Sequence, residues 1–120
     1  MGQQPTRQYT FQDLIEITRR VMRNFDAVEQ RSWTVEAAMI ELMKQVGDLA
    51  RRIMTTEHYY LPDREHDPAY ATDKEGIADE LADVLYCVMR VADHYGIDLE
   101  QAHLQARRKE LRYVGKDADF

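Results

Sequence analysis

The chain has 120 residues, of which 44% are hydrophobic and 32% are charged, and its formal net charge is −6. This length and balance indicate one globular domain over residues 1–120 and exclude a disordered chain. Because an acidic chain lacks the clustered lysines and arginines that attract phosphate backbones and anionic membrane surfaces, we expect neither DNA nor a membrane as a partner.

The composition also bounds the compartment and the fold class. The single cysteine, Cys87, excludes an intrachain disulfide and a thiolate zinc site. Residues 1–10 contain no apolar signal-peptide segment, and no apolar run approaches the ~20 residues of a membrane span. We therefore expect a cytoplasmic protein. With only 5 glycines and 3 prolines, the sequence predicts an all-α fold.

Four helices are predicted, and the first two have clear starting signals. Thr10 is the expected N-cap of the first helix, whose apolar stripe runs to about Gln30. Thr34 is the expected N-cap of the second helix, which carries a wide apolar face as far as Met54. Threonine suits both positions because its hydroxyl accepts a hydrogen bond from a free N–H group of the first turn.

The periodic pattern then stops between residues 55 and 76, where two prolines fall. We predict a long loop there with a short helical turn, and loops of this length in compact domains are usually functional or mobile. The third helix is expected to begin between Asp73 and Gly76 and to reach Tyr95. Gly96 is the residue expected to end it, since glycine readily adopts the left-handed conformation.

A fourth helix is predicted from its N-cap Asp98 to about Tyr113, followed by a tail at 115–120. The apolar faces of the first three helices are wider than one small bundle hides. This excess predicts a homo-oligomer that shares its core. Gly47 lies inside the second helix, where glycine costs about 1 kcal/mol relative to alanine. We expect another helix of the chain, or a partner subunit, to cross there.

Two helices carry polar residues spaced one turn apart beside their apolar faces. At about 100° of rotation per residue, the second helix places three polar side chains in one stripe: Glu41, Gln45 and Asp48. The third helix places Glu80 and Asp83 in a similar stripe. Oxygen ligands that project inward from facing helices can hold Mg²⁺. The commoner use of such residues is a solvated helix face, and the spacing alone leaves both interpretations open.

Longer stretches around these residues resemble a known family. "QVGDLARRI" (45–53), followed by "ADELADVLYCVMRVADHYGIDLEQA" (78–102), is similar to the MazG-like all-α nucleoside triphosphate pyrophosphohydrolases. That family carries E-x-x-E on one helix and E-x-x-D on the next. The resemblance covers roughly residues 33–113, and its second half, with "DELADVL" and "YGIDL", is the specific part.

The resemblance implies a four-helix MazG-like bundle that hydrolyses a nucleoside triphosphate to the monophosphate and pyrophosphate. It implies dependence on Mg²⁺, with Mn²⁺ as a substitute, and assembly as a homodimer or homotetramer. By motif, Glu80 and Asp83 are the expected catalytic residues. The expected metal ligands are Glu41, Gln45, Asp48, Glu80 and Asp83.

The first acidic motif departs from the family pattern. Gln45 stands where relatives have glutamate, and Lys44 stands where several relatives have another acid. Glu41 lies one turn before Gln45 and is placed to restore the lost negative charge. These departures motivate an alternative, a catalytically degenerate relative that binds a nucleotide or a partner without hydrolysis. A structural helical oligomer with an acidic surface is the third hypothesis.

Four further residues are candidates for substrate binding, and each has a plainer alternative. Trp33 is predicted to stack on a base or, equally, to pack as a hydrophobic staple before the second helix. Tyr86 follows Asp83 by three residues and either touches the nucleoside or fills a half-buried core position. Arg107 and Arg112 on the fourth helix are placed to contact phosphate, although exposed arginines usually have no partner of this kind.

Overall fold

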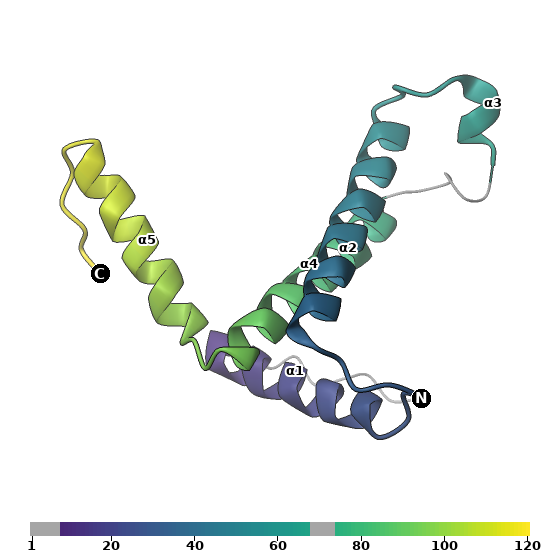
Figure 1. Ribbon diagram of the computed structural model, residues 1–120. Coiled ribbons are helices and arrows are strands. Elements are labelled where there is room, and N and C mark those ends of the chain that lie inside the picture. The colour runs from purple at the N-terminus through teal and green to yellow at the C-terminus, as the bar shows by residue number, and fades with distance from the viewer. Residues whose placement is uncertain (1–7, 68–73) are drawn as a thin grey trace.

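The computed structural model describes residues 8–67 and 74–120. Every regular element within these two ranges is an α-helix (Figure 1). The five helices are α1 (Phe11–Asp26), α2 (Val35–Thr56), α3 (Pro62–Glu65), α4 (Lys74–His94) and α5 (Leu99–Tyr113). The predicted all-α class is confirmed. Among the described helices, none combines the length and the apolar character that a membrane crossing requires.

The predicted helix ends are set by local hydrogen bonds. The side chains of Thr10, Thr34 and Asp98 each accept a hydrogen bond from the backbone N–H three residues later, at 3.0, 3.1 and 3.1 Å. All three predicted N-caps are therefore confirmed. Gly96 has a φ of 63°, a left-handed conformation that residues with a side chain rarely adopt, and it follows the end of α4 as predicted.

The first helix is shorter than the sequence predicts. It ends at Asp26 rather than near Gln30, because the N–H groups of Val28 and Glu29 both turn back to the carbonyl of Phe25. Val28 continued the apolar period in the sequence, yet its side chain is 77% exposed and packs into no core. Residues 27–34 therefore form a loop that links α1 to α2.

The predicted loop at 55–76 is partly helical. The second helix extends into it as far as Thr56, and α3 supplies the expected short helical turn, beginning with Pro62 at a position where proline is tolerated. The next long helix begins at Lys74, within the predicted interval. Asp73, the other limit of that interval, lies outside the described residues.

The helices form an open arrangement rather than a closed bundle. The second and fourth helices lie side by side and antiparallel, α1 packs against α4 near one end of this pair, and α5 projects away from it (Figure 1). The radius of gyration is 18.1 Å, compared with about 14 Å for a compact chain of this length. The all-helical architecture is consistent with the predicted MazG-like helical bundle, and within one chain α5 extends away from the other helices.

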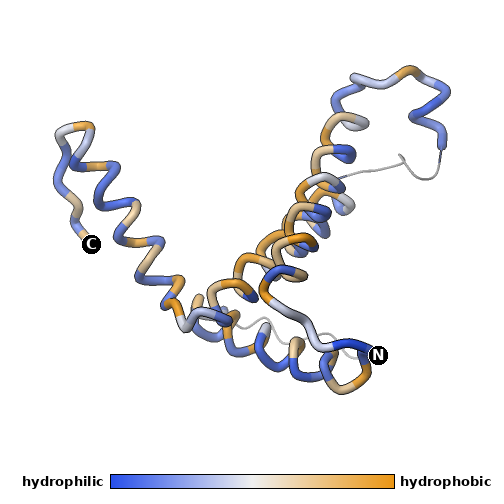
Figure 2. Tube along the Cα trace, in the orientation of Figure 1, coloured by the Kyte–Doolittle hydropathy of each residue, from blue (hydrophilic) through white to orange (hydrophobic). Residues whose placement is uncertain are grey.

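The core is small and lies where α1, α2 and α4 meet. Its buried apolar residues are Ile15, Met22, Ala38, Cys87, Met89 and Ala92. Large apolar side chains remain exposed along the α2–α4 pair, whose hydrophobic residues are orange in Figure 2. Ile40 is 69% exposed, Met43 70% and Leu81 53%. The shared oligomeric core stays a prediction, and these are the residues that it would bury.

Gly47 is not a crossing point within the chain. Among the atoms of the described residues, a Cβ atom placed on Gly47 would meet no neighbour within 4 Å, so neither α1 nor α4 approaches its backbone closely. The expectation of an intrachain crossing is therefore wrong. Gly47 follows Met43 by one helical turn and is exposed, as Met43 is. Only the alternative, an approach by a partner subunit, stays a prediction.

Candidate functional site

The packing of α2 on α4 brings the two predicted acidic sets to one helix pair. An ion pair joins them directly, since Arg52 Nε on α2 lies 2.9 Å from Glu80 Oε1 on α4. Glu41 and Gln45 of α2 also line one cavity together with Asp83 of α4. The structure thus gathers four of the five residues predicted as metal ligands along the α2–α4 interface: Glu41, Gln45, Glu80 and Asp83. Asp48, the fifth, pairs with Lys44 and Arg51 of its own helix.

The polar stripe on α2 is bonded within itself. Gln45 Nε2 donates a hydrogen bond of 2.9 Å to Glu41 Oε1. Lys44 Nζ lies 3.5 Å from the same Glu41 oxygen and 3.7 Å from Asp48 Oδ2. Arg51 Nη2 lies 3.6 Å from the other oxygen of Asp48. The carboxylates of α2 are therefore shared between two cations of the same helix.

Glu80 is the most buried of the predicted ligands, with 8% of the residue exposed. Its Oε1 atom accepts the hydrogen bond from Arg52, whereas its Oε2 atom is buried and has no hydrogen-bond partner among residues 8–67 and 74–120. A buried carboxylate oxygen without a donor or a cation is costly. A bound cation would satisfy this oxygen, so Glu80 fits the role of a metal ligand.

Asp83 is exposed in the single chain and lies among other carboxylates. Partial desolvation is the main cause that raises its pKa, and the negative charges of Glu80, Asp79 and Glu41 raise it further. Lys44 opposes this shift. The carboxylates of both helices therefore share one negative field, which a divalent cation would relieve.

The donor set suits a hard divalent cation, but its side chains face internal cations instead. Carboxylate and amide oxygens are the ligands that Mg²⁺ takes in proteins. In residues 8–67 and 74–120, no group of three or more histidine, cysteine, aspartate or glutamate side chains is close enough together to hold a metal ion. A metal would require Lys44 and Arg52 to release carboxylates with which they pair. The residues thus fit the ion by chemistry, and their side-chain arrangement would have to change on binding.

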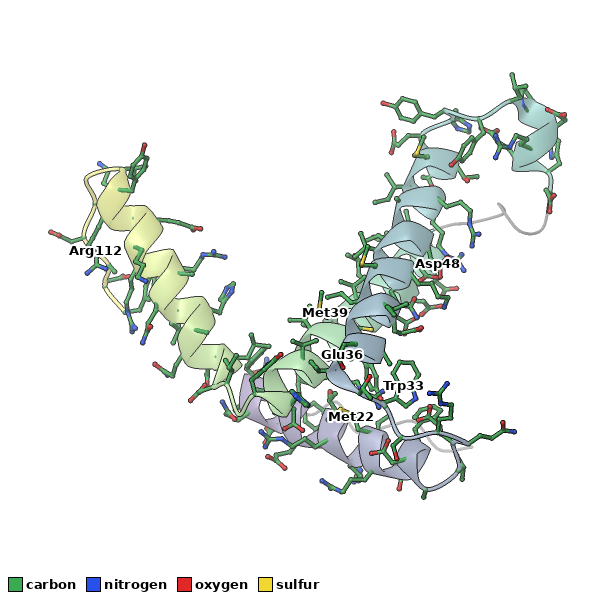
Figure 3. The ribbon with its side chains drawn as sticks, viewed as in Figure 1. Met22, Trp33, Glu36, Met39, Asp48 and Arg112 are labelled. Atoms are coloured by element: carbon green, nitrogen blue, oxygen red, sulfur yellow. The ribbon has the colours of Figure 1, made fainter. Side chains whose placement is uncertain are left out.

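A cavity of about 350 Å³ adjoins these carboxylates where α1, α2 and α4 meet. Trp33 and Tyr86, both predicted to bind substrate, line it together with Glu41 and Asp83. Figure 3 shows Trp33 beside the start of α2, while Asp48 lies further along that helix. This size lies near the lower limit of small-molecule pockets. The cavity therefore joins an aromatic end to an acidic end.

The aromatic end contains two charged residues that the sequence interpretation missed. Trp33 donates its indole N–H to a Glu29 carboxylate oxygen. The guanidinium of Arg90 lies 4.5 Å from the centre of the Trp33 ring, and its Nη2 atom lies 3.6 Å from Asp26. Arg90 follows Asp83 by seven residues, two helical turns, and this spacing on one helix face is the signal that could have identified it.

A second, larger cavity of about 550 Å³ lies on the other side of this cluster. It shares Glu29, Trp33 and Arg90 with the first cavity but includes none of the predicted metal ligands. Arginines and acids both line its wall, and some of them pair: Arg19 with Asp93 at 2.6 Å and Arg90 with Asp26 at 3.6 Å. The smaller cavity is therefore the better candidate for chemistry.

Arg107 and Arg112 are not brought to this site within one chain. Both lie on α5, and Figure 3 shows Arg112 far from Trp33 and Asp48. Arg107 Nη2 pairs instead with Glu110 of its own helix at 2.8 Å. Their role in phosphate binding stays a prediction, and it requires α5 of one chain to approach the site of another.

Sequence comparisons support the acidic helices as the informative part of the chain. Residues 34–109 match the sequence profile of the phosphoribosyl-ATP pyrophosphohydrolase family. The chain is also 30% identical over 92 residues to the uncharacterized protein YvdC of Bacillus subtilis (strain 168). This aligned segment covers 72% of the chain and 87% of YvdC. No solved structure matches the chain significantly. The family match begins just after Trp33, so Glu29 and α1 lie outside it.

Proposed function

The chain belongs to the phosphoribosyl-ATP pyrophosphohydrolase family, within the MazG-like all-α superfamily that its sequence resembles, and on this premise we propose that it hydrolyses a nucleoside triphosphate. The products would be the nucleoside monophosphate and pyrophosphate, and the reaction would need Mg²⁺ or Mn²⁺. One observation carries the proposal beyond family membership. The α2 and α4 carboxylates border a cavity whose other end is aromatic, as a substrate with phosphates and a base requires.

The proposed metal ligands divide into a charged set and one neutral oxygen. Glu41, Asp48, Glu80 and Asp83 would supply the charge, and Gln45 would supply its amide oxygen. A divalent cation, when bound, would supply the positive charge that the triphosphate needs beside these carboxylates. Because the pairs of Lys44 and Arg52 occupy the same carboxylates, metal binding and loss of these pairs would be coupled. The amide of Gln45 already hydrogen-bonds to Glu41, which limits how far either side chain moves independently.

Asp83 is the proposed base and Glu80 helps to hold the site. The oxygen of a water molecule would bond to the α-phosphorus. At the same time, the bond from that phosphorus to the oxygen that bridges the α- and β-phosphates would break. The electron pair of the broken bond would leave with pyrophosphate, and the proton of the water would pass to Asp83. Without a cation, partial desolvation and the neighbouring carboxylates raise the pKa of Asp83. A bound cation would lower this pKa and keep the carboxylate ionised, as a base must be at neutral pH.

We also propose that the active form is a homodimer or homotetramer. The exposed apolar residues of the α2–α4 pair, such as Ile40, Met43 and Leu85, support this, since monomers rarely leave so many large apolar side chains in water. In an oligomer, α5 of one chain can lie against the cavity of another. The proposed phosphate contacts of Arg107 and Arg112 depend on that arrangement.

A second candidate function is supported by the internal ion pairs. Lys44 is shared between Glu41 and Asp48, and Arg52 pairs with the most buried ligand, Glu80. A chain that neutralises its own acidic site suits a relative that binds a nucleotide, or a protein partner, without hydrolysis. Tight nucleotide binding without turnover would favour this function over the enzyme.

The proposal is tested by incubating the protein with standard and modified nucleoside triphosphates and Mg²⁺ or Mn²⁺ and measuring pyrophosphate. We expect at least one nucleotide to be cleaved, and Asp83→Ala to reduce the rate by at least about 100-fold, as expected for loss of a general base. Asp117→Ala, in the exposed tail, is the matched control and should retain full activity. Absence of pyrophosphate across the panel, or an Asp83→Ala rate equal to that of the wild type, would refute the proposal.

A further inference from the structure

Three residues at the aromatic end of the 350 Å³ cavity take no part in the proposed bond-breaking step. Glu29, Trp33 and Arg90 line this cavity together with the catalytic Asp83. They come from the α1–α2 loop and from α4, so only the folded chain brings them together. We call these three residues the Glu29–Trp33–Arg90 cluster.

The cluster fixes the Glu29 carboxylate in place. The backbone N–H of Glu29 donates a 2.9 Å hydrogen bond to the Phe25 carbonyl, and one carboxylate oxygen accepts the indole N–H of Trp33. Trp33 is itself stacked against Arg90, whose guanidinium is also held near Asp26. A carboxylate restrained at both backbone and side chain loses little freedom on meeting a ligand, which favours selective recognition.

One side of this carboxylate is open for a ligand. Within the described residues, Glu29 Oε1 makes no hydrogen bond or ion pair with the protein, while Oε2 retains a second lone pair beside the indole contact. An ionised carboxylate is an acceptor only, so it can bind N–H groups and repels carbonyl oxygens. Its preference therefore depends on the hydrogen-bonding edge of the base.

We infer that Glu29 is a specificity-determining residue that selects guanine-type bases, an inference that rests on the proposed function. Guanine presents two adjacent N–H donors, one on the ring and one amino, which match the two oxygens of a carboxylate. The carbonyl beside these donors needs a hydrogen-bond donor of its own. Arg90 and Tyr86 line the same cavity and carry such donors.

The other bases match this arrangement less well. Adenine and cytosine present one amino donor beside a ring nitrogen acceptor, which would face a carboxylate oxygen. Uracil presents one N–H donor between two carbonyl oxygens, so a carbonyl would meet the Glu29 carboxylate. A site built to hydrogen-bond one edge rejects an edge that leaves its polar groups unpaired. The expected order of binding is therefore guanine, then adenine and cytosine, then uracil.

Trp33 provides a direct readout because it is the one tryptophan in the sequence. Its fluorescence is measured during titration with the non-hydrolysable α,β-methylene triphosphates of guanosine, inosine, adenosine and uridine, with Mg²⁺ present. We expect the guanosine analogue to bind about 10- to 100-fold more tightly than the uridine analogue. The inosine analogue, which lacks only the amino group, should fall between them.

The Glu29→Gln variant tests the residue itself. Its amide offers one acceptor and one donor, so it should weaken guanosine binding by about tenfold or more. It should improve adenosine binding relative to guanosine, since adenine offers the complementary donor and acceptor. Glu36→Gln, an exposed substitution outside both cavities, is the matched control and should leave the order unchanged. Glu29→Asp keeps the carboxylate and serves if Glu29→Gln does not fold.

The outcomes separate this inference from the proposed function. Equal affinity for the guanosine and uridine analogues, or an unchanged order in Glu29→Gln, overturns the inference even if the wild type releases pyrophosphate. Guanine-selective binding without pyrophosphate release supports the inference and overturns the proposed hydrolysis. Absence of both binding and turnover overturns both.

Discussion

Replacing Lys44 with glutamine should raise the affinity of the protein for Mg²⁺. The Lys44 ammonium lies 3.5 Å from Glu41 and 3.7 Å from Asp48, so it competes with a cation for two proposed ligands. Glutamine has no charge and two fewer methylene groups, which leaves both carboxylates available without adding bulk. Both ion pairs also stabilise α2, so the same substitution should lower the melting temperature slightly without metal.

The size of the effect follows from the exposure of the three side chains. Lys44 is 61% exposed, Glu41 31% and Asp48 27%, so water screens each pair strongly. An exposed ion pair of this kind changes an equilibrium by roughly 1.5- to 5-fold. Two such pairs, broken together, predict a gain in Mg²⁺ affinity of about 2- to 30-fold. Removal of the repulsion between the lysine and the metal acts in the same direction.

The gain is measured by isothermal titration with Mg²⁺ at roughly 0.1 M ionic strength, where the Debye length is about 10 Å, and with Mn²⁺ by electron paramagnetic resonance. Lys109→Gln is the matched control. It removes one lysine charge from α5, where Lys109 is exposed and forms no ion pair with the described residues. Its affinity for both metals should stay within about twofold of the wild type, since charges further apart than a Debye length are largely screened.

The reasoning would be refuted if Lys44→Gln bound Mg²⁺ no more tightly than the wild type. A change equal to that of Lys109→Gln would be just as damaging, because it would assign the effect to net charge rather than to the two pairs. Opposite changes in metal affinity and in metal-free stability are the expected signature of a lysine that competes with a cation.

Two more variants test separate parts of the account. Asp83→Asn should melt at a higher temperature than the wild type near pH 7 without divalent ions, because a raised folded-state pKa gives stability at low pH that is lost as pH rises through it. The gain should be below about 1 kcal/mol for this exposed group, should shrink as pH falls through the raised folded-state pKa, and should be gone below the ordinary carboxyl pKa of 3.8. No gain at pH 7 would show that desolvation and the neighbouring carboxylates do not disfavour the Asp83 carboxylate. Gly47→Leu should leave the helix content unchanged, since no atom of the described part of the chain lies within 4 Å of a Cβ placed there, yet reduce the mass measured by light scattering to that of a single chain. An unchanged oligomer would exclude Gly47 from the interface.

The features that the sequence predicted correctly depend on contacts that are local in the chain. The caps at Thr10, Thr34 and Asp98 need only a backbone N–H three residues away, and Gly96 needs only its own φ angle. The all-α class follows from composition and from helical period. Family membership follows from two motifs whose residues are close together in the sequence, so no tertiary information was needed for it.

The features that the sequence did not predict depend on how the helices meet. Arg52 and Glu80 are 28 residues apart, and their ion pair requires a particular rotation of α2 against α4. Glu29 and Arg90 meet at Trp33 only because α1 ends early and its loop turns toward α4. Such contacts leave no periodic signal, and the apolar spacing that continued to Val28 even obscured the end of α1.

The sequence also did not predict the position of α5 or the surroundings of Gly47. A helix with apolar residues on one side predicts that something covers it, but it does not say whether the same chain or another does so. In a single chain, α5 projects away from the other helices, and no described atom covers Gly47. Both features therefore depend on the oligomer, which the light-scattering measurement addresses.

The most direct test of the central claim is ³¹P nuclear magnetic resonance of a reaction with nucleoside triphosphate and Mg²⁺. We expect the monophosphate and pyrophosphate to appear together in equal amounts with the wild-type protein and to be almost absent with Asp83→Ala. Release of orthophosphate and a nucleoside diphosphate, or no cleavage of any nucleotide, would contradict a pyrophosphohydrolase site between α2 and α4.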